Sequence, residues 1–148
     1  MATLRYFEDF RIGETIECGL TTFNKEEILE FARKFDPQPF HVDEQLAARS
    51  AFGGLVASGW HTCAACMRLI VDHMHTASMG SPGVESIRWL KPVRPGDTLK
   101  LIATVLAVEA SKSRPDRGRV TYSYDMSNLA GEPVMSMRAV GIVARRPG

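Results

Sequence analysis

The second half of the chain restricts the fold most strongly, because one long apolar helix is followed only by strands. The helical pattern runs from about Ser58 to Thr76. Six apolar residues form one broad stripe on it: Cys63, Cys66, Met67, Ile70, Val71 and Met74. Ala64 and Ala65 leave little polar surface beside the stripe. We therefore expect this helix to be enclosed on most sides.

Strand patterns fill the rest of that half and also precede the helix. They cover residues 84–90, 98–110, 119–128 and 134–144, and an earlier one covers residues 15–21. A curved, mostly antiparallel sheet wrapped around the central helix would bury that helix, which predicts an α+β fold. The chain has 148 residues, no internal repeat and no linker. We expect a single domain over residues 1–148.

The segment before the long helix contains a second helical pattern. Asn24 is a candidate N-cap with Glu27 at the capping-box position. Residues Ile28, Phe31, Ala32 and Phe35 recur at helical spacing, which predicts one buried face. This helix ends at Asp36, and residues 42–49 form a candidate short helix capped by Asp43.

Between these helices lies the stretch from Phe35 to Asp43, in which we expect no regular element. Pro37 and Pro39 prevent continuation of the helix and make the loop stiff. The loop therefore holds Asp36 and His41 with little freedom, and a carboxylate and an imidazole so placed can act as an acid–base pair. A carboxylate is also unfavourable at a helix C-terminus, so the position of Asp36 indicates a functional reason.

A candidate anion site opens the long helix at Ser58 and Gly59. The first amides of a helix have no partner inside it, and the helix dipole favours negative charge beside them. The Gly59 amide is therefore a candidate donor to a polarised carbonyl, although glycine there also permits close packing of helix on sheet. Ser58 is a candidate N-cap or substrate contact. We expect Trp60 to pack or to line a pocket wall, and His61 to be structural.

Charge and hydropathy argue against several classes of partner. The formal net charge of +1 gives no support for nucleic-acid binding. No apolar run reaches the roughly 18 residues of a membrane-spanning helix, and residues 1–8 do not resemble a signal peptide. We expect a cytoplasmic protein without a membrane partner.

Cys63 and Cys66 form a C-x-x-C pattern, which is compatible with redox chemistry or metal binding. The chain has no second such pair, and its third cysteine, Cys18, is distant in the sequence. Positions three apart share a helix face, and here both fall on the apolar stripe. The pattern favours core packing over a metal or redox site.

The motif Asp36-Pro37-Gln38-Pro39-Phe40-His41 resembles the Asp-x-x-x-x-His motif of the MaoC-like, (R)-specific enoyl-CoA hydratase family, which has the hot-dog fold. Residues 12–14, 57–59 and 91–97 also resemble family landmarks in the expected order, so the resemblance covers nearly the whole chain. One departure is Ser58, since many members have histidine before the glycine that corresponds to Gly59. The side-chain contact of that histidine would be lost or replaced by Ser58.

The resemblance implies reversible addition of water to a 2-enoyl thioester, giving an (R)-3-hydroxyacyl thioester, as in fatty acid metabolism. Asp36 and His41 would be the catalytic pair, and Gly59, with Ser58, would bind the thioester. No metal or other cofactor is implied, and coenzyme A would be part of the substrate, although an acyl carrier protein stays open. The partners implied are the acyl-CoA substrate and a second copy, in a homodimer or dimer of dimers. The basic candidates for phosphate contacts are Arg88, Lys91, Arg94, Arg114, Arg117 and Arg119.

Two alternatives stay open at this point. One is a hot-dog acyl-CoA thioesterase, a class that usually has a carboxylate on or near the central helix. Residues 58–70 contain no Asp or Glu, and the first is Asp72. The other alternative is a non-catalytic acyl-binding protein, against which the intact Asp36 and His41 pair argues.

Overall fold

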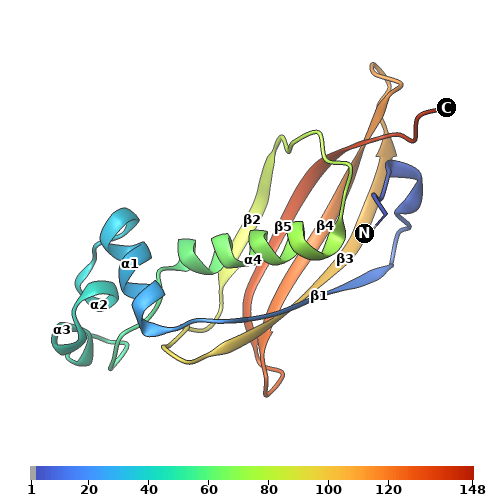
Figure 1. The fold of residues 1–148 in the computed structure, drawn as a ribbon. Coiled ribbons are helices and arrows are strands. Elements are labelled where there is room, and N and C mark those ends of the chain that lie inside the picture. Colours follow the sequence, from blue (N-terminus) through green and yellow to red (C-terminus); the bar gives the residue numbers. More distant parts are fainter. Residues whose placement is uncertain (1–2) are drawn as a thin grey trace.

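Five antiparallel strands form one sheet in the order β1-β3-β4-β5-β2, and the long helix α4 crosses one face of it (Figure 1). The computed structural model describes residues 3–148; residues 1–2, within the stretch where we expect no signal peptide, lie outside it. The elements are a 3-10 turn (Phe7–Asp9), β1 (Thr15–Thr22), α1 (Lys25–Phe35), α2 (Pro39–Val42), α3 (Glu44–Ala48), α4 (Gly59–Met74), β2 (Gly83–Trp89), β3 (Thr98–Ala110), β4 (Arg117–Asn128) and β5 (Pro133–Ala144). The predicted α+β hot-dog arrangement is confirmed.

The alternating pattern of the strands produces the core. Leu99, Leu101 and Ala103 of β3 are fully buried. Their partners in the ladder with β4 include Tyr124 and Met126, which are buried as well. Alternate side chains of neighbouring strands therefore meet on the side of the sheet that faces α4, as the sequence predicts.

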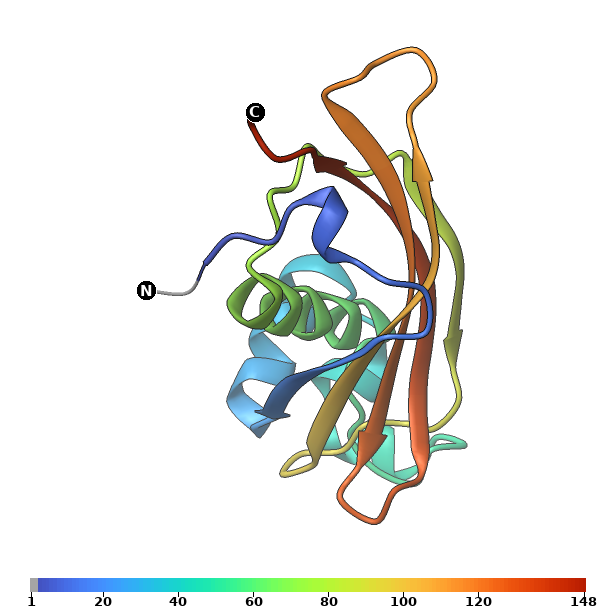
Figure 2. The same ribbon diagram turned by 90° about the vertical axis from the view of Figure 1, so that its right-hand side faces the viewer.

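The prediction that α4 is enclosed on most sides is wrong. Its buried face consists of Thr62, Cys66, Leu69 and Met74. On the other side Trp60, Met67 and Val71 are 57%, 53% and 64% exposed. Figure 2 shows the reason, because the sheet lies on one side of the helix only.

The positions of the cysteines agree with the prediction that they pack in the core. Cys66 and Cys18 are fully buried in the core, and Cys63 is half-buried. Burial raises the pKa of the Cys66 thiol to about 12, which keeps it protonated and unreactive. Within residues 3–148 no group of three or more His, Cys, Asp or Glu side chains is arranged to hold a metal ion.

Helix α1 lies with α2 and α3 beyond the N-terminal end of α4 (Figure 1). The Asn24 side chain accepts a hydrogen bond of 2.8 Å from the Glu27 amide, as expected for an N-cap. Ile28 and Ala32 are fully buried, but Phe35 is largely exposed, so its predicted burial is wrong. Its aromatic neighbour is Phe31 of the same helix, with ring centroids 5.1 Å apart.

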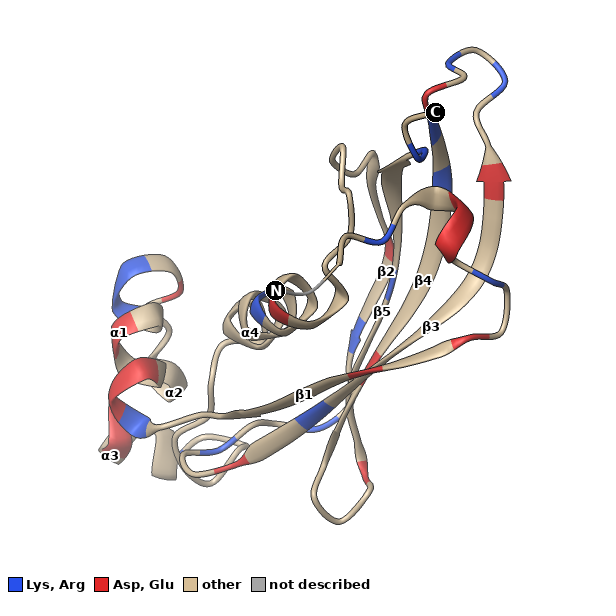
Figure 3. Cartoon of the chain, turned by 45° about the vertical axis from the view of Figure 1, so that its right-hand side comes forward, with Lys and Arg blue, Asp and Glu red and all other residues tan. Residues whose placement is uncertain are grey.

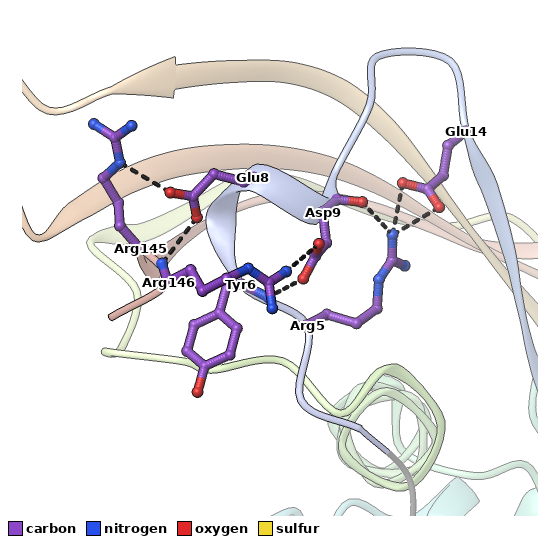
Figure 4. Close-up of polar contacts among 7 residues, drawn as sticks. All are labelled: Arg5, Tyr6, Glu8, Asp9, Glu14, Arg145 and Arg146. Carbon is purple, nitrogen blue, oxygen red and sulfur yellow. Dashed lines mark hydrogen bonds and ion pairs between the residues drawn. The ribbon is translucent and has the colours of Figure 1, made fainter. Parts of the chain in front are cut away.

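Ion pairs fasten the N-terminal segment to the body and to the end of the chain (Figure 4). Arg5 pairs with Glu14 at 2.7 Å, and Arg145 pairs with Glu8 at 3.3 Å. Acidic and basic residues are interspersed around these ends and along α1 (Figure 3). Exposed pairs of this kind add little stability individually, so the cluster mainly orients the segment.

No helix among residues 3–148 is long and apolar enough to span a membrane. The expected cytoplasmic location stays a prediction.

Candidate active site

The stretch that carries Asp36 and His41 is more regular than the sequence predicts. Asp36 is the C-cap of α1, and its amide donates to the Ala32 carbonyl. Residues Pro39 to Val42 then form the helical turn α2, so the expectation of no regular element is wrong there. Pro39 occupies the first turn, where the missing N–H is not needed and the fixed φ suits a helix. A proline that ends one helix can thus be followed at once by one that begins another.

The carboxylate and the imidazole face each other. Asp36 Oδ2 lies 3.4 Å from His41 Nε2, and their side chains are only 17% and 8% exposed. Ser58 donates to Asp36 Oδ2 at 2.7 Å, and Gln38 donates to Oδ1 at 2.7 Å. Burial acts to raise the pKa of Asp36, but these hydrogen bonds and the nearby His41 lower it overall. The Asp36 carboxylate is therefore ionised at neutral pH.

The other nitrogen of the imidazole is fixed by the backbone. His41 Nδ1 lies 2.6 Å from the Val56 carbonyl oxygen, and a carbonyl oxygen only accepts. Nδ1 therefore carries a proton, and in the neutral ring Nε2 is the basic nitrogen that faces Asp36. The Val56 amide in turn donates to the Phe40 carbonyl at 3.1 Å, so two adjacent bonds hold this part of α2 in place.

The start of α4 lies beside the pair. Ser58 is fully buried and caps the helix, and its oxygen accepts from the Trp60 amide at 3.2 Å. The sequence suggested Ser58 as an N-cap or substrate contact; the structure shows the cap and a bond to Asp36. The Gly59 amide has no hydrogen-bond acceptor among the described residues, as expected at the first helical position.

Close packing explains why residue 59 has no side chain. A Cβ atom on Gly59 would lie 2.5 Å from Cε2 of Trp89, at the end of β2. The indole Nε1 of Trp89 donates to the Gly59 carbonyl at 2.9 Å. The packing interpretation of Gly59 therefore holds, and it leaves the amide free for a ligand.

A cavity of about 380 Å³ joins these groups. Asp36, His41 and Gly59 all line it, so the structure brings three of the four predicted site residues to one cavity, and the fourth, Ser58, donates to Asp36. Its other lining residues are mostly apolar and include Phe40, Phe52, Trp60, Trp89, Leu90, Val93 and Val134. Of the six basic candidates for phosphate contacts, Lys91 alone lines the cavity.

The sequence missed the Val56 carbonyl, the Gln38 amide and the Trp89 indole. The sequence gives no signal for a contact that uses a backbone carbonyl. Gln38 was noticed only as one residue of the motif, without a role of its own. Trp89 had a weak signal, as a large aromatic residue near the end of the expected strand at residues 84–90 and shortly before the turn-rich break at residues 91–97.

His61 does not line this cavity and packs instead between aromatic rings. Its ring stacks on Phe31 with centroids 4.9 Å apart and meets the edge of Phe23 at 5.0 Å. Burial lowers the pKa of His61, while Glu27 acts in the opposite direction. A neutral packing residue agrees with the structural role expected from the sequence.

Comparison with known proteins gives a consistent group of relatives. The family described as MaoC like domain matches residues 9–127. A crystal structure of the MaoC-like dehydratase from Rhodospirillum rubrum superimposes with a TM-score of 0.91 at 44% identity and covers 97% of this chain and 99% of that one. Uncharacterized protein YdeM of Bacillus subtilis is 35% identical over 67% of this chain and 72% of its own length.

Other curated relatives are more distant or longer. The (R)-specific enoyl-CoA hydratase of Rhodospirillum rubrum is 25% identical over 97% of this chain and 94% of its own length. Two other relatives are much longer, and the chain spans 30% and 39% of their lengths.

Proposed function

The chain belongs to the MaoC-like domain family, and on that premise we propose that it is an enoyl-CoA hydratase that adds water reversibly to a 2-enoyl thioester. The proposed product is the (R)-3-hydroxyacyl thioester. The observation that carries the proposal is the contact of an ionised Asp36 with His41 Nε2 on the wall of a largely apolar cavity. A relative named as an (R)-specific enoyl-CoA hydratase supports the same reaction.

Asp36 and His41 act on the attacking water in this proposal. Because Nδ1 of His41 donates to Val56, Nε2 can accept a proton from a water that also contacts the Asp36 carboxylate. The water oxygen bonds to C3 of the enoyl group as its proton moves to the pair. The pair then returns a proton to C2, so the atoms of one water are added across the double bond and the pair is restored.

The Gly59 amide would bind the thioester carbonyl oxygen. Negative charge develops on that oxygen when water attacks C3, and an unpaired amide at a helix N-terminus is suited to stabilise it. Trp89 holds the same turn through the Gly59 carbonyl, so the donor is fixed before substrate arrives. Each step uses groups of this chain and water, so the proposal requires no metal or redox cofactor, and coenzyme A enters as part of the substrate.

The direct test is the hydration of crotonyl-CoA, followed as loss of absorbance of the conjugated thioester. We expect turnover without release of free thiol. An (R)-specific or (S)-specific 3-hydroxyacyl-CoA dehydrogenase, added in parallel, reports the configuration of the product. Thiol release in place of hydration, or binding without any turnover, would contradict the proposal.

The thioesterase alternative lacks a suitably placed carboxylate on α4. Asp72 follows Gly59 by thirteen positions, which is about 20 Å along a helix at 1.5 Å per residue. It is exposed and pairs with Arg68 at 2.8 Å. No Asp or Glu of α4 therefore lies where it can activate water at a carbonyl bound by Gly59.

Replacement of Ser58 by alanine is expected to move the acid limb of the kcat/KM profile to higher pH. The Ser58 hydroxyl stabilises the ionised Asp36, so its loss raises the pKa of that carboxyl. Activity that needs ionised Asp36 is present above this pKa and disappears as pH falls through it. Ser123→Ala is a matched control, because Ser123 donates to an exposed carboxylate, Asp125, at 2.8 Å on the sheet. An unchanged acid limb in Ser58→Ala would argue against Asp36 as the ionised partner.

We also propose that the protein forms a homodimer, alone or within a dimer of dimers. Trp60, Met67 and Val71 leave an apolar stripe of α4 exposed. The neighbouring strand β2 is at the edge of the sheet, and Val84 on it is half-exposed. An exposed strand edge beside an apolar helix face is suited to pairing with a second copy.

Light scattering is expected to give about twice the 16.4 kDa of one chain, or a multiple of that value. Val71→Glu, which places a charge in the apolar stripe, should shift the protein toward the monomer. Arg68→Ala is the control on the same helix, because its side chain is 80% exposed. An active monomer of 16.4 kDa would contradict the dimer.

A further inference from the structure

The connection between α3 and α4 contributes three residues to the wall of the site cavity: Phe52, Val56 and Ala57. The Phe52 ring lies beside the Phe40 ring with centroids 5.1 Å apart, and the Phe40 ring lies beside the His41 imidazole at 4.5 Å. Three rings therefore form a continuous row that ends at the imidazole of the proposed catalytic pair. Phe52, which is 38% exposed, is the most exposed member of this row.

The tip of this connection, residues 51–54, has only local hydrogen bonds of its own. The Gly53 amide donates to the Ser50 carbonyl at 3.0 Å, and the Phe52 amide donates to the Ser50 hydroxyl at 3.2 Å. Gly53 has a φ of +67°, which favours glycine, and no atom lies within 4 Å of the position of a Cβ there. This side of the turn is therefore open, and its own bonds do not hold it against the rest of the protein.

Arg94 supplies the long-range contact of this turn. Its Nη2 donates to the Phe52 carbonyl at 2.6 Å, and its Nη1 lies 3.3 Å from the position of a Cβ on Gly54. Within residues 3–148 this is the only hydrogen bond that joins residues 51–54 to a distant part of the chain. The Arg94 backbone is itself fixed, since its amide donates to Asp97 Oδ2 at 2.9 Å and its carbonyl accepts from the Asp97 amide at 3.0 Å.

We propose that Arg94 is a positioning residue that holds Phe52 on the wall of the cavity, and that the Phe52 ring limits the width of the acyl group beside the catalytic pair. The inference rests on the proposed function, since it places the acyl group in this cavity. The other use of the guanidinium is the phosphate contact considered from the sequence, although Arg94 does not line the cavity. The two uses of Arg94 predict different results in the experiments below.

The width of the site is measured with a straight and a branched ligand. Binding of butanoyl-CoA and 2-methylbutanoyl-CoA is measured by calorimetry, and hydration is measured with crotonyl-CoA and 2-methylcrotonyl-CoA. We expect the wild-type protein to prefer the straight ligand by about tenfold or more, because one added carbon in a closely fitting apolar pocket can change affinity by that factor. Phe52→Ala should remove most of this preference, and Arg94→Met should reduce it. Arg138→Met removes an exposed guanidinium on β5 and is the matched control with an unchanged ratio.

Two further variants separate positioning by Arg94 from phosphate binding. If Arg94 acts through Phe52, adding Arg94→Met to Phe52→Ala should leave the ratio of Phe52→Ala unchanged. Arg94→Lys keeps a donor and should retain most of the wild-type ratio, because a single N–H reaches the Phe52 carbonyl. The changes should be the same with acyl-pantetheine ligands, which lack the phosphates of coenzyme A. A loss that is confined to the coenzyme A ligands and adds to that of Phe52→Ala would show phosphate binding and overturn the positioning role.

A purely structural role for Phe52 weakens both ligands alike. A wild-type protein without the preference, or an unchanged ratio in folded Phe52→Ala, overturns the inference. If a variant does not fold, Phe52→Leu or Arg94→Gln takes its place and is judged by the same ratio. A protein that binds acyl-CoA with the expected ratios but hydrates no substrate contradicts the proposed function and leaves the role of Phe52. Hydration of crotonyl-CoA with unchanged ratios contradicts only the inference, and absence of acyl-CoA binding overturns both.

Discussion

Replacing Asp36 with asparagine is expected to lower kcat/KM for crotonyl-CoA hydration by about 10²–10⁴-fold. Asparagine keeps the shape of the side chain but removes the negative charge that faces His41 Nε2 across 3.4 Å. His41→Ala should cause a loss of similar size, because it removes the nitrogen that accepts the proton. Since the two groups act on one water, the double variant should lose little more than either single variant.

Stability has to be measured beside activity in this series. His41→Ala leaves the buried Val56 carbonyl without its partner, which typically costs about 1–3 kcal/mol. Thermal unfolding therefore separates a folded, inactive variant from a destabilised one. Asp72→Asn is the control for loss of a carboxylate, because Asp72 is exposed near the far end of α4. Near wild-type turnover in a folded Asp36→Asn or His41→Ala protein would remove the pair from the mechanism.

The second large effect is expected from loss of the Gly59 amide, about 10²–10³-fold in rate. A direct Gly59→Pro change would mix this effect with a clash, because any Cβ at position 59 meets the Trp89 ring. The comparison is therefore made in a Trp89→Ala background, between Gly59→Ala and Gly59→Pro. These two variants both add a Cβ, and only proline removes the N–H.

The helix should survive this substitution. Proline is favoured at the first helical position, and Ser58 before it has φ −58° and ψ 138°, a conformation compatible with a following proline. Circular dichroism checks the helix content of both variants. Equal rates for the alanine and proline variants would show that the Gly59 amide does not stabilise the transition state.

The order and extent of most elements could be predicted from the sequence, because alternation and capping are local signals. Residues 98–110 were predicted as a strand and form β3 with the same bounds, and Asn24 caps α1 as expected. Burial was predicted less well. Phe35 and Met67 have the right spacing for a buried face, yet both are exposed, because periodicity does not reveal how far a neighbouring element extends.

Much of the candidate site could be predicted because its residues are close in sequence. Asp36 and His41 share one short stretch, and Gly59 opens the next long helix. The bond from Ser58 to Asp36 joins residues twenty-two positions apart, and Trp89 reaches Gly59 from thirty positions away. Such contacts depend on how the elements dock, and the sequence pattern carries little information about that.

The division of the motif between a helix cap and a separate helical turn has a consequence for comparing sequences. Asp36 ends α1, and His41 is held within α2 by the backbone of Val56, so their approach depends on the number of residues between them more than on which residues these are. One inserted or deleted residue in α2 rotates the imidazole by about 100°. In an alignment, a single gap between the carboxylate and the imidazole therefore carries more weight than several substitutions at the intervening positions.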